Sequence, residues 1–374
     1  MQMKWLLGLL IIFAIIGVVF SFYIANYFLK IALLKDNPWY HKKGHRLLNP
    51  DNFQERETRY TKIEEQQKQE GEAFWTESFA EDRWLKIKDE TLYARCFIPY
   101  PDNHRWAICV HGYRSNGKRD MAYTALRFAE EGYNVLVPDL RAHGKSSGNK
   151  IGMGWLDRLD LLSWLSEVLA IDMEAEIILV GGSMGAATVM MASGEKLPTN
   201  VRGLIVDCGY TSVYDEFKYV LHESFHLPAF PILTIANQLA LNNYGFQLKN
   251  ASSVRQLHKN TLPTFFIHGT GDRFVPMTMF EENLAATQGI KKGLIVAKAP
   301  HLSSSVYEPE NYYSSIFEFL EENCPAVKQY PTKKDMDFHD SMSFFCLTRL
   351  VKFKVLKKKN NGAKLPRQRN HFIE

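Results

Sequence analysis

The most restrictive feature of the sequence is a glycine-rich turn between an apolar strand pattern and an apolar helix pattern. The apolar run at residues 177–180 leads into G-x-S-x-G at residues 181–185, and small and apolar residues continue to residue 191. A strand that enters a helix through this pattern turns so sharply that its central residue is strained, and the flanking glycines keep side chains away from the crossing backbone. The pattern predicts that Ser183 is a nucleophile at a helix start. A serine that only caps the helix is the alternative.

Strand patterns and helix patterns alternate on both sides of this turn. Apolar runs typical of strands occupy residues 106–110, 134–138, 176–180, 201–206, 264–267 and 293–297. Apolar residues at helical spacing occupy residues 119–131, 154–169, 184–196 and 311–322. This alternation predicts an α/β fold with a mostly parallel central sheet flanked by helices. The aromatic-rich segment 209–260 is too long for a simple crossover, so we expect it to be a mainly helical insertion over the sheet.

A serine nucleophile needs a base, and the base needs an acid that orients it. Asp272 lies in a glycine-flanked turn after the strand pattern 264–267, and His301 lies in a loop after the next strand pattern. Side chains at successive strand ends of a parallel sheet can converge on one site. Alone, either residue fits an ordinary loop, but their order after Ser183 predicts a Ser-His-Asp triad. Asp207, at another strand end, is the second candidate for the acid.

An acyl-transfer site also needs donors for the oxyanion. We expect one donor to be the backbone N–H of Met184, directly after the nucleophile. The other is expected to be the N–H of Tyr113, in the turn after the strand at residues 106–110. We interpret His111 in the same turn as a residue that holds the loop rather than one that transfers protons.

Three stretches carry a resemblance to a known family. Residues 137–148, 181–185 and 268–276 are similar to motifs of the α/β-hydrolase superfamily, in particular its bacterial membrane-anchored, prolyl-oligopeptidase-like and serine-aminopeptidase-like branches. The resemblance extends over about residues 84–323. It implies an α/β-hydrolase fold with residues 209–260 as its cap. It also implies roles for single residues: nucleophile Ser183, acid Asp272, base His301, and oxyanion donors Tyr113 and Met184.

The N-terminal segment is apolar over its whole length. Trp5–Leu29 contains no charged residue, and 25 helical residues would span a hydrocarbon core of about 30 Å. We therefore predict a transmembrane anchor at residues 1–34. A cleavable signal peptide is the alternative, although the stretch is long and residues 23–25 form a poor cleavage site. The basic residues after the span favour a cytoplasmic body. The opposite orientation, with the body outside the cytoplasm, is the alternative. N-terminal membrane helices that follow only a few residues commonly export the domain behind them.

The rest of the chain divides by composition. Residues 35–73 are expected to be a polar linker or an exposed helix, residues 74–325 the hydrolase domain, and residues 326–374 a basic tail. The net charge is +4, but residues 325–374 contain 12 basic and 4 acidic residues, so the remainder is mildly acidic. An acidic body argues against nucleic acid as a partner. The tail either binds an anionic membrane surface or forms a basic extension.

The sequence gives no sign of a cofactor or a metal. The five cysteines are scattered without a C-x-x-C pair, which indicates neither a disulfide framework nor a zinc site. The basic loop at residues 141–148 lacks the spacing of a phosphate-binding loop.

The predicted function is a membrane-anchored serine hydrolase that cleaves small-molecule acyl esters through an acyl-enzyme intermediate. A serine peptidase is the alternative, with Glu216 or Glu223 in the cap binding the peptide terminus. A non-catalytic binding protein on a hydrolase fold is a further alternative, and it would be expected to lack part of the triad.

Overall fold

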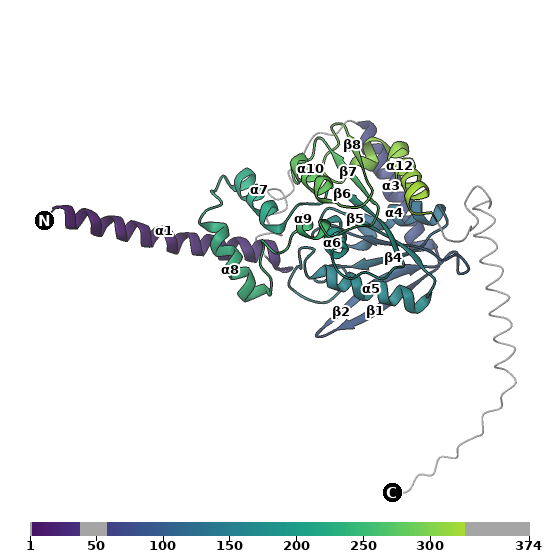
Figure 1. The fold of residues 1–374 in the computed structure, drawn as a ribbon, viewed down its shortest axis with the longest axis horizontal. Coiled ribbons are helices and arrows are strands. Elements are labelled where there is room, and N and C mark those ends of the chain that lie inside the picture. Colours follow the sequence, from purple (N-terminus) through teal and green to yellow (C-terminus); the bar gives the residue numbers. More distant parts are fainter. Residues whose placement is uncertain (1, 38–57, 326–374) are drawn as a thin grey trace, which may run out of the picture.

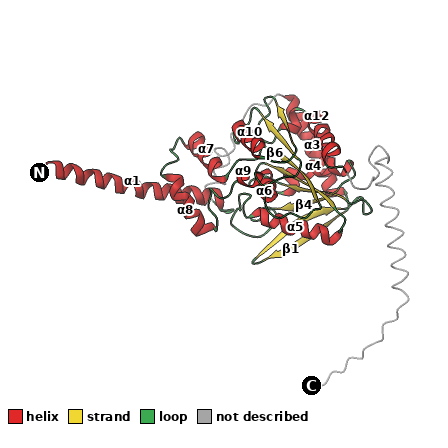
Figure 2. Ribbon diagram, viewed as in Figure 1, coloured by secondary structure: helices red, strands yellow, loops and turns green. Residues whose placement is uncertain are grey.

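The computed structural model describes residues 2–37 and 58–325 (Figure 1). The predicted basic tail at residues 326–374 lies outside the described residues, as does much of the predicted linker. The predictions for those segments therefore stay predictions. The described residues form one sheet with helices on both faces, and a long helix projects from one end (Figure 2).

The sheet has eight strands in the order β1-β2-β4-β3-β5-β6-β7-β8. From β3 onward all neighbouring strands are parallel, whereas β1 and β2 form an antiparallel hairpin that pairs with β4. The bounds are β1 (Ala80–Ile87), β2 (Glu90–Phe97), β3 (Arg105–Val110), β4 (Asn134–Asp139), β5 (Glu176–Gly182), β6 (Val201–Asp207), β7 (Thr264–Gly269) and β8 (Lys291–Val296). The predicted mostly parallel sheet is confirmed, and the hairpin adds two strands that the sequence patterns did not indicate.

Alternate side chains of the central strands point to opposite faces. On β3, Trp106 and Ile108 belong to one buried cluster, and Ala107 and Cys109 to another. The first cluster packs under α5 (Asp157–Ile171), α6 (Met184–Ser193) and α10 (Met277–Ala286). The second packs under α3 (Thr58–Glu77), α4 (Gly117–Glu130) and α12 (Pro309–Asn323). This two-sided burial explains why these strands read as continuous apolar runs.

Three helices lie between β6 and β7, where the sequence predicted an insertion. They are α7 (Val213–Phe225), α8 (Ile232–Tyr244) and α9 (Ser253–Leu257). In both ribbon views α7 and α8 flank the end of α1 (Gln2–Leu33) that enters the body (Figures 1 and 2). Phe28 of α1 makes edge-to-face contacts with Phe217 and Phe225 of α7, with ring centroids 5.1 and 6.0 Å apart.

Helix α1 has two parts with different surroundings. It is long and apolar enough to cross a membrane, and most side chains between Trp5 and Tyr23 are exposed. From Ala25 to Leu33, by contrast, six side chains are buried in the core of the body. The structure thus differs from the expectation of an anchor separate from the body, because the last turns of the apolar helix pack against the cap.

Part of the predicted linker is a docked helix. Helix α3 begins at residue 58 and packs against α4, where the backbone of Tyr123 approaches so closely that Gly71 has no room for a side chain. Glu72 pairs with Lys118 at 2.8 Å, and the Gln67 amide donates to the Ser305 carbonyl at 2.8 Å. A few contacts on one face therefore hold a helix whose overall composition is polar.

Candidate active site

The turn at Ser183 has the strained geometry that the sequence predicted. Ser183 joins β5 to α6 with φ 55° and ψ −120°, a region that residues with a side chain rarely occupy. A Cβ at position 181 would lie 2.4 Å from the Gly185 carbonyl oxygen. A Cβ at position 185 would lie 2.0 Å from the Val110 carbonyl oxygen. Because neither glycine has a side chain, the backbones of the strand, the turn and the helix can approach one another this closely.

Ser183, His301 and Asp272 form a continuous hydrogen-bonded chain. His301 Nε2 lies 2.8 Å from Ser183 Oγ, and His301 Nδ1 lies 2.7 Å from Asp272 Oδ2. A carboxylate only accepts, so Nδ1 carries the proton and Nε2 presents its lone pair to the serine hydroxyl. The structure thus brings together the three residues that the sequence placed in one site.

Asp272 is held as an ionised acceptor. Its second oxygen, Oδ1, accepts the backbone N–H groups of Phe274 and Val275, both at 2.8 Å. Burial alone would raise the pKa of Asp272, but the neighbouring His301 ring and these hydrogen bonds bring that pKa below its usual value. A carboxylate in this state fixes both the orientation and the tautomer of the imidazole.

Asp207, the second candidate acid, bonds to groups other than His301. Its Oδ2 accepts the Tyr312 hydroxyl at 3.0 Å, and its backbone carbonyl accepts the Ser183 N–H at 2.8 Å. Burial raises the pKa of this carboxyl. Asp207 therefore supports the nucleophile turn through its main chain, and Asp272 is the acid bonded to His301.

The two predicted oxyanion donors flank the serine. Met184 is the first residue of α6, where helix N–H groups have no intrahelical acceptor. Tyr113 follows β3 and lines the same pocket as Ser183. The buried His111 ring holds this loop: Nδ1–H donates to the Gly112 carbonyl at 2.7 Å, and Nε2 accepts the Leu140 N–H at 2.9 Å.

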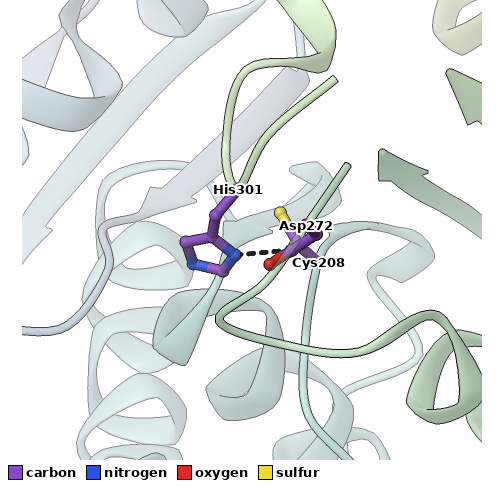
Figure 3. A group of neighbouring side chains, drawn as sticks. All are labelled: Cys208, Asp272 and His301. Atoms are coloured by element: carbon purple, nitrogen blue, oxygen red, sulfur yellow. Dashed lines mark hydrogen bonds and ion pairs between the residues drawn. The ribbon is translucent and has the colours of Figure 1, made fainter. Parts of the chain in front are cut away.

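Cys208 lies beside the acid and the base, a position that the sequence analysis did not single out. Figure 3 shows its sulfur next to Asp272 and His301, and the potential ligand atoms of the three residues lie within 4.8 Å of one another. The Cys208 thiol donates to Asp207 Oδ1 at 3.0 Å. Burial and the nearby carboxylates raise the pKa of the thiol well above its usual value. With this pKa the thiol keeps its proton and acts as the hydrogen-bond donor to Asp207.

Ser183 lines a largely apolar pocket that is partly open to solvent. The lining comes from α1, from the cap and from loops of the body. It consists of Phe28, Ile31, Ala32, Tyr113, Met153, Ser183, Tyr210, Glu216, Phe217, Val220 and Phe274. The α1 residues in this lining were not foreseen, because the sequence analysis treated that helix only as an anchor.

Glu216 is the only charged side chain among these lining residues. It is 3% exposed, and neither carboxyl oxygen has a hydrogen-bond partner in the described part of the chain. Burial raises the pKa of Glu216 well above its usual value, which favours the neutral acid. Glu223, the other cap carboxylate considered, is exposed and pairs with His222 instead.

Residues 107–310, more than half of the chain, match the model of a family described as "Alpha/beta hydrolase family". The chain belongs to the alpha/beta hydrolase family. The uncharacterized protein YqkD of Bacillus subtilis is 27% identical over 221 residues, which cover 59% of this chain and 72% of YqkD. The uncharacterized protein YfhR of Escherichia coli K12 is 24% identical over 235 residues, which cover 60% of this chain and 74% of YfhR.

Solved hydrolases share the fold. The Pyrococcus furiosus esterase Pf2001 superposes with a TM-score of 0.52 at 21% identity, covering 66% of this chain and 92% of the esterase. The Pyrococcus horikoshii acylaminoacyl peptidase superposes with a TM-score of 0.51 at 16% identity, covering 70% of this chain and 44% of the peptidase. At these identities the likeness extends to the fold alone, and hydrolase activity in general follows from the family.

Proposed function

We propose that the protein is a membrane-anchored serine hydrolase that cleaves acyl esters through an acyl-enzyme intermediate. The observation that carries the proposal is the hydrogen-bonded chain from Ser183 through His301 to Asp272, with distances of 2.8 and 2.7 Å. The nucleophile Ser183 is bonded to a base, and the base His301 is bonded to the acid Asp272. The pocket beside the serine is apolar enough for an acyl chain.

In the first half-reaction, Ser183 Oγ attacks the ester carbonyl while His301 Nε2 takes the hydroxyl proton. The N–H groups of Met184 and Tyr113 stabilise the oxyanion. His301 then gives its proton to the leaving alcohol, and the acyl group stays on Ser183. In the second half-reaction, His301 takes a proton from water and the resulting hydroxide equivalent attacks the acyl-enzyme. The acid leaves and the proton returns to Ser183.

The packing of α1 supports retention of the helix in the mature protein. A signal peptide is removed, yet Ala25–Leu33 contributes core and pocket side chains to the body. Cleavage after Leu33 would expose that core, and residues 23–25, where cleavage would leave most of these side chains in place, form a poor cleavage site. We therefore propose that the exposed apolar part of α1 spans the membrane. Lys30 and Lys35, next to the body, favour the cytoplasmic side.

A peptidase is the second candidate, and Glu216 is the observation that bears on it. A carboxylate in the pocket could hold the ammonium group of a peptide. The raised pKa of Glu216, caused by burial, favours the uncharged form and therefore an uncharged substrate group. Acyl esters accordingly come first in the proposal.

The test is labelling of the full-length protein in detergent with a fluorophosphonate probe, together with hydrolysis of p-nitrophenyl esters and of peptide amides. We expect parent protein to be labelled and Ser183→Ala not to be. Ser193→Ala, at the opposite end of α6, is the matched control and should be labelled like the parent. Folded parent protein that neither reacts with the probe nor hydrolyses any ester would refute the proposal. Hydrolysis of amides but not esters would favour the peptidase.

A further inference from the structure

The wall of the pocket opposite the body comes from the proposed anchor itself. Phe28, Ile31 and Ala32 of α1 line the same cavity as Ser183. Phe28 also packs edge-to-face against Phe217, another lining residue. The cavity beside the nucleophile is therefore incomplete without the last turns of α1.

The loop that bears a proposed oxyanion donor is bonded to the same turns. The Tyr113 hydroxyl donates to the Ala32 carbonyl at 2.8 Å. The Arg114 guanidinium donates to the carbonyls of Ile31 at 2.7 Å, Leu34 at 2.6 Å and Lys35 at 2.9 Å. These bonds satisfy carbonyls that a helix C-terminus leaves without partners, so α1 is fixed against the active-site loop.

The remainder of α1 is a continuous apolar surface that leads to this wall. Side chains from Trp5 to Phe20 are apolar and mostly more than half exposed. Eight residues, about 12 Å of helix, separate Phe20 from Phe28. Exposed apolar side chains of this density require a lipid environment, and the pocket therefore lies about two turns beyond lipid-covered helix.

The cap extends the apolar surface next to α1. Phe230, in the loop between α7 and α8, is 77% exposed, and Leu241 of α8 and Tyr27 of α1 are each at least 40% exposed. Helices α7 and α8 lie on the side of the body from which α1 emerges (Figure 1). Exposed aromatic and aliphatic side chains on helices that pack beside an apolar helix are typical of a surface at a membrane interface.

From these observations we infer that the substrate is a membrane-resident amphiphile with a long acyl ester, and that its chain reaches Ser183 along α1, which forms part of the acyl-binding site. This inference rests on the proposed ester hydrolysis and adds the substrate class and its route. It requires that changes in α1 side chains alter chain-length preference, which a simple tether would not do.

The first experiment measures kcat/KM of full-length protein in detergent for p-nitrophenyl palmitate and p-nitrophenyl butyrate. Ile31→Phe adds volume to the wall, and we expect it to lower the palmitate-to-butyrate ratio at least tenfold. Phe28→Ala removes volume from the wall, and we expect it to raise the ratio. The matched control is Val18→Phe, on the exposed part of α1, which should keep the parent ratio. Phe28→Leu replaces Phe28→Ala if the latter does not fold.

The second experiment tests the route with 4-methylumbelliferyl palmitate in phosphatidylcholine vesicles. The ester is placed either in the vesicles that contain the protein or in separate, protein-free vesicles. We expect initial hydrolysis to be at least tenfold faster when both share one bilayer. Equal rates would mean that the ester arrives through water and would overturn the inference.

The outcomes separate this inference from the proposed function. Butyrate hydrolysis that is lost in Ser183→Ala, with an unchanged chain-length ratio in the folded α1 variants, would refute the α1 site and leave the serine hydrolase standing. Absence of hydrolysis for both esters in folded parent protein would refute both.

Discussion

Ser183 is the residue where function and stability conflict most directly. Its positive φ costs free energy for any residue with a Cβ, and the surrounding glycines and packing maintain it. Glycine adopts this conformation without steric cost.

We therefore predict that Ser183→Gly is more stable than Ser183→Ala by about 1 kcal/mol, net of the extra chain entropy of glycine. Both variants lack the hydroxyl, so neither should hydrolyse esters. Urea unfolding of the two proteins in the same detergent measures the difference. Equal or reversed stabilities would show that the turn is not strained.

Glu216 gives a prediction on pH. Burial raises its folded-state pKa well above the usual value, so between the unfolded and folded pKa values the folded chain binds a proton that the unfolded chain releases. Below the pKa of Glu216 in the unfolded chain, the carboxyl is protonated in both states and does not lower the free energy of unfolding. As the pH rises from that pKa toward the folded-state pKa, the free energy of unfolding falls.

We expect Glu216→Gln to gain stability relative to the parent as pH increases from 5 to 8, at up to about 1.4 kcal/mol per pH unit within that window. Unfolding free energies at four pH values test this. Glu223→Gln, an exposed cap position, is the control and should run parallel to the parent. A parallel profile for Glu216→Gln as well would contradict a neutral buried acid.

At the residue scale, the sequence located those functional groups whose signal is local. The spacing around Ser183 and the glycine turn at Asp272 are short-range patterns, and strand order brings His301 to them. Cys208 and Phe28 carry no such pattern. Their place in the site depends on how β6 ends and how α1 docks, which are long-range packing results that a single sequence does not encode in a motif.

At the element scale, buried strands were the most predictable parts. The six predicted strand runs agree with β3 to β8 within about two residues at each end. For β3 to β7 the reason is that strands buried on both faces consist of consecutive apolar residues, whereas β8 is a largely exposed edge strand. The β1-β2 hairpin was not predicted because β1 contains three consecutive charged residues, Glu81–Arg83, and has no strong turn signal. For α3 the sequence predicted a linker or an exposed helix but not its docking, because the residues that contact the body lie within a highly polar sequence.

Arg114 fixes the end of α1 against the body. Its guanidinium binds three carbonyls at the end of α1, and removing it leaves them without these donors. We predict that Arg114→Ala costs about 2–3 kcal/mol of unfolding free energy and speeds hydrogen exchange in the last turn of α1.

Arg114→Lys keeps the charge but not the planar fork, and we expect it to recover less than half of the loss. The exposed Arg119→Ala should change stability by less than about 0.5 kcal/mol. Exchange rates in α1 that do not respond to Arg114→Ala would show that packing alone holds the helix.

At the scale of the whole molecule, α1 and the body share one core. Deletion of residues 2–20 removes only the exposed turns of α1, whereas deletion of residues 2–34 also removes buried side chains and a pocket wall. We predict that the shorter deletion yields folded protein in detergent that hydrolyses p-nitrophenyl butyrate, and that the longer deletion aggregates. Size-exclusion chromatography and esterase assays measure both. A monomeric, active protein after the longer deletion would disprove the shared core.

In the proposed membrane-anchored hydrolase, the bonds between Arg114 and α1 would also couple the bilayer mechanically to catalysis. Tyr113, a proposed oxyanion donor, precedes Arg114 in the chain, so a tilt of α1 pulls on the loop that holds the donor. Helices tilt when their apolar length exceeds the thickness of the hydrocarbon layer. A hydrolase built as we propose would therefore sense membrane thickness, and its turnover would differ between thin and thick bilayers without any change in substrate or ligand.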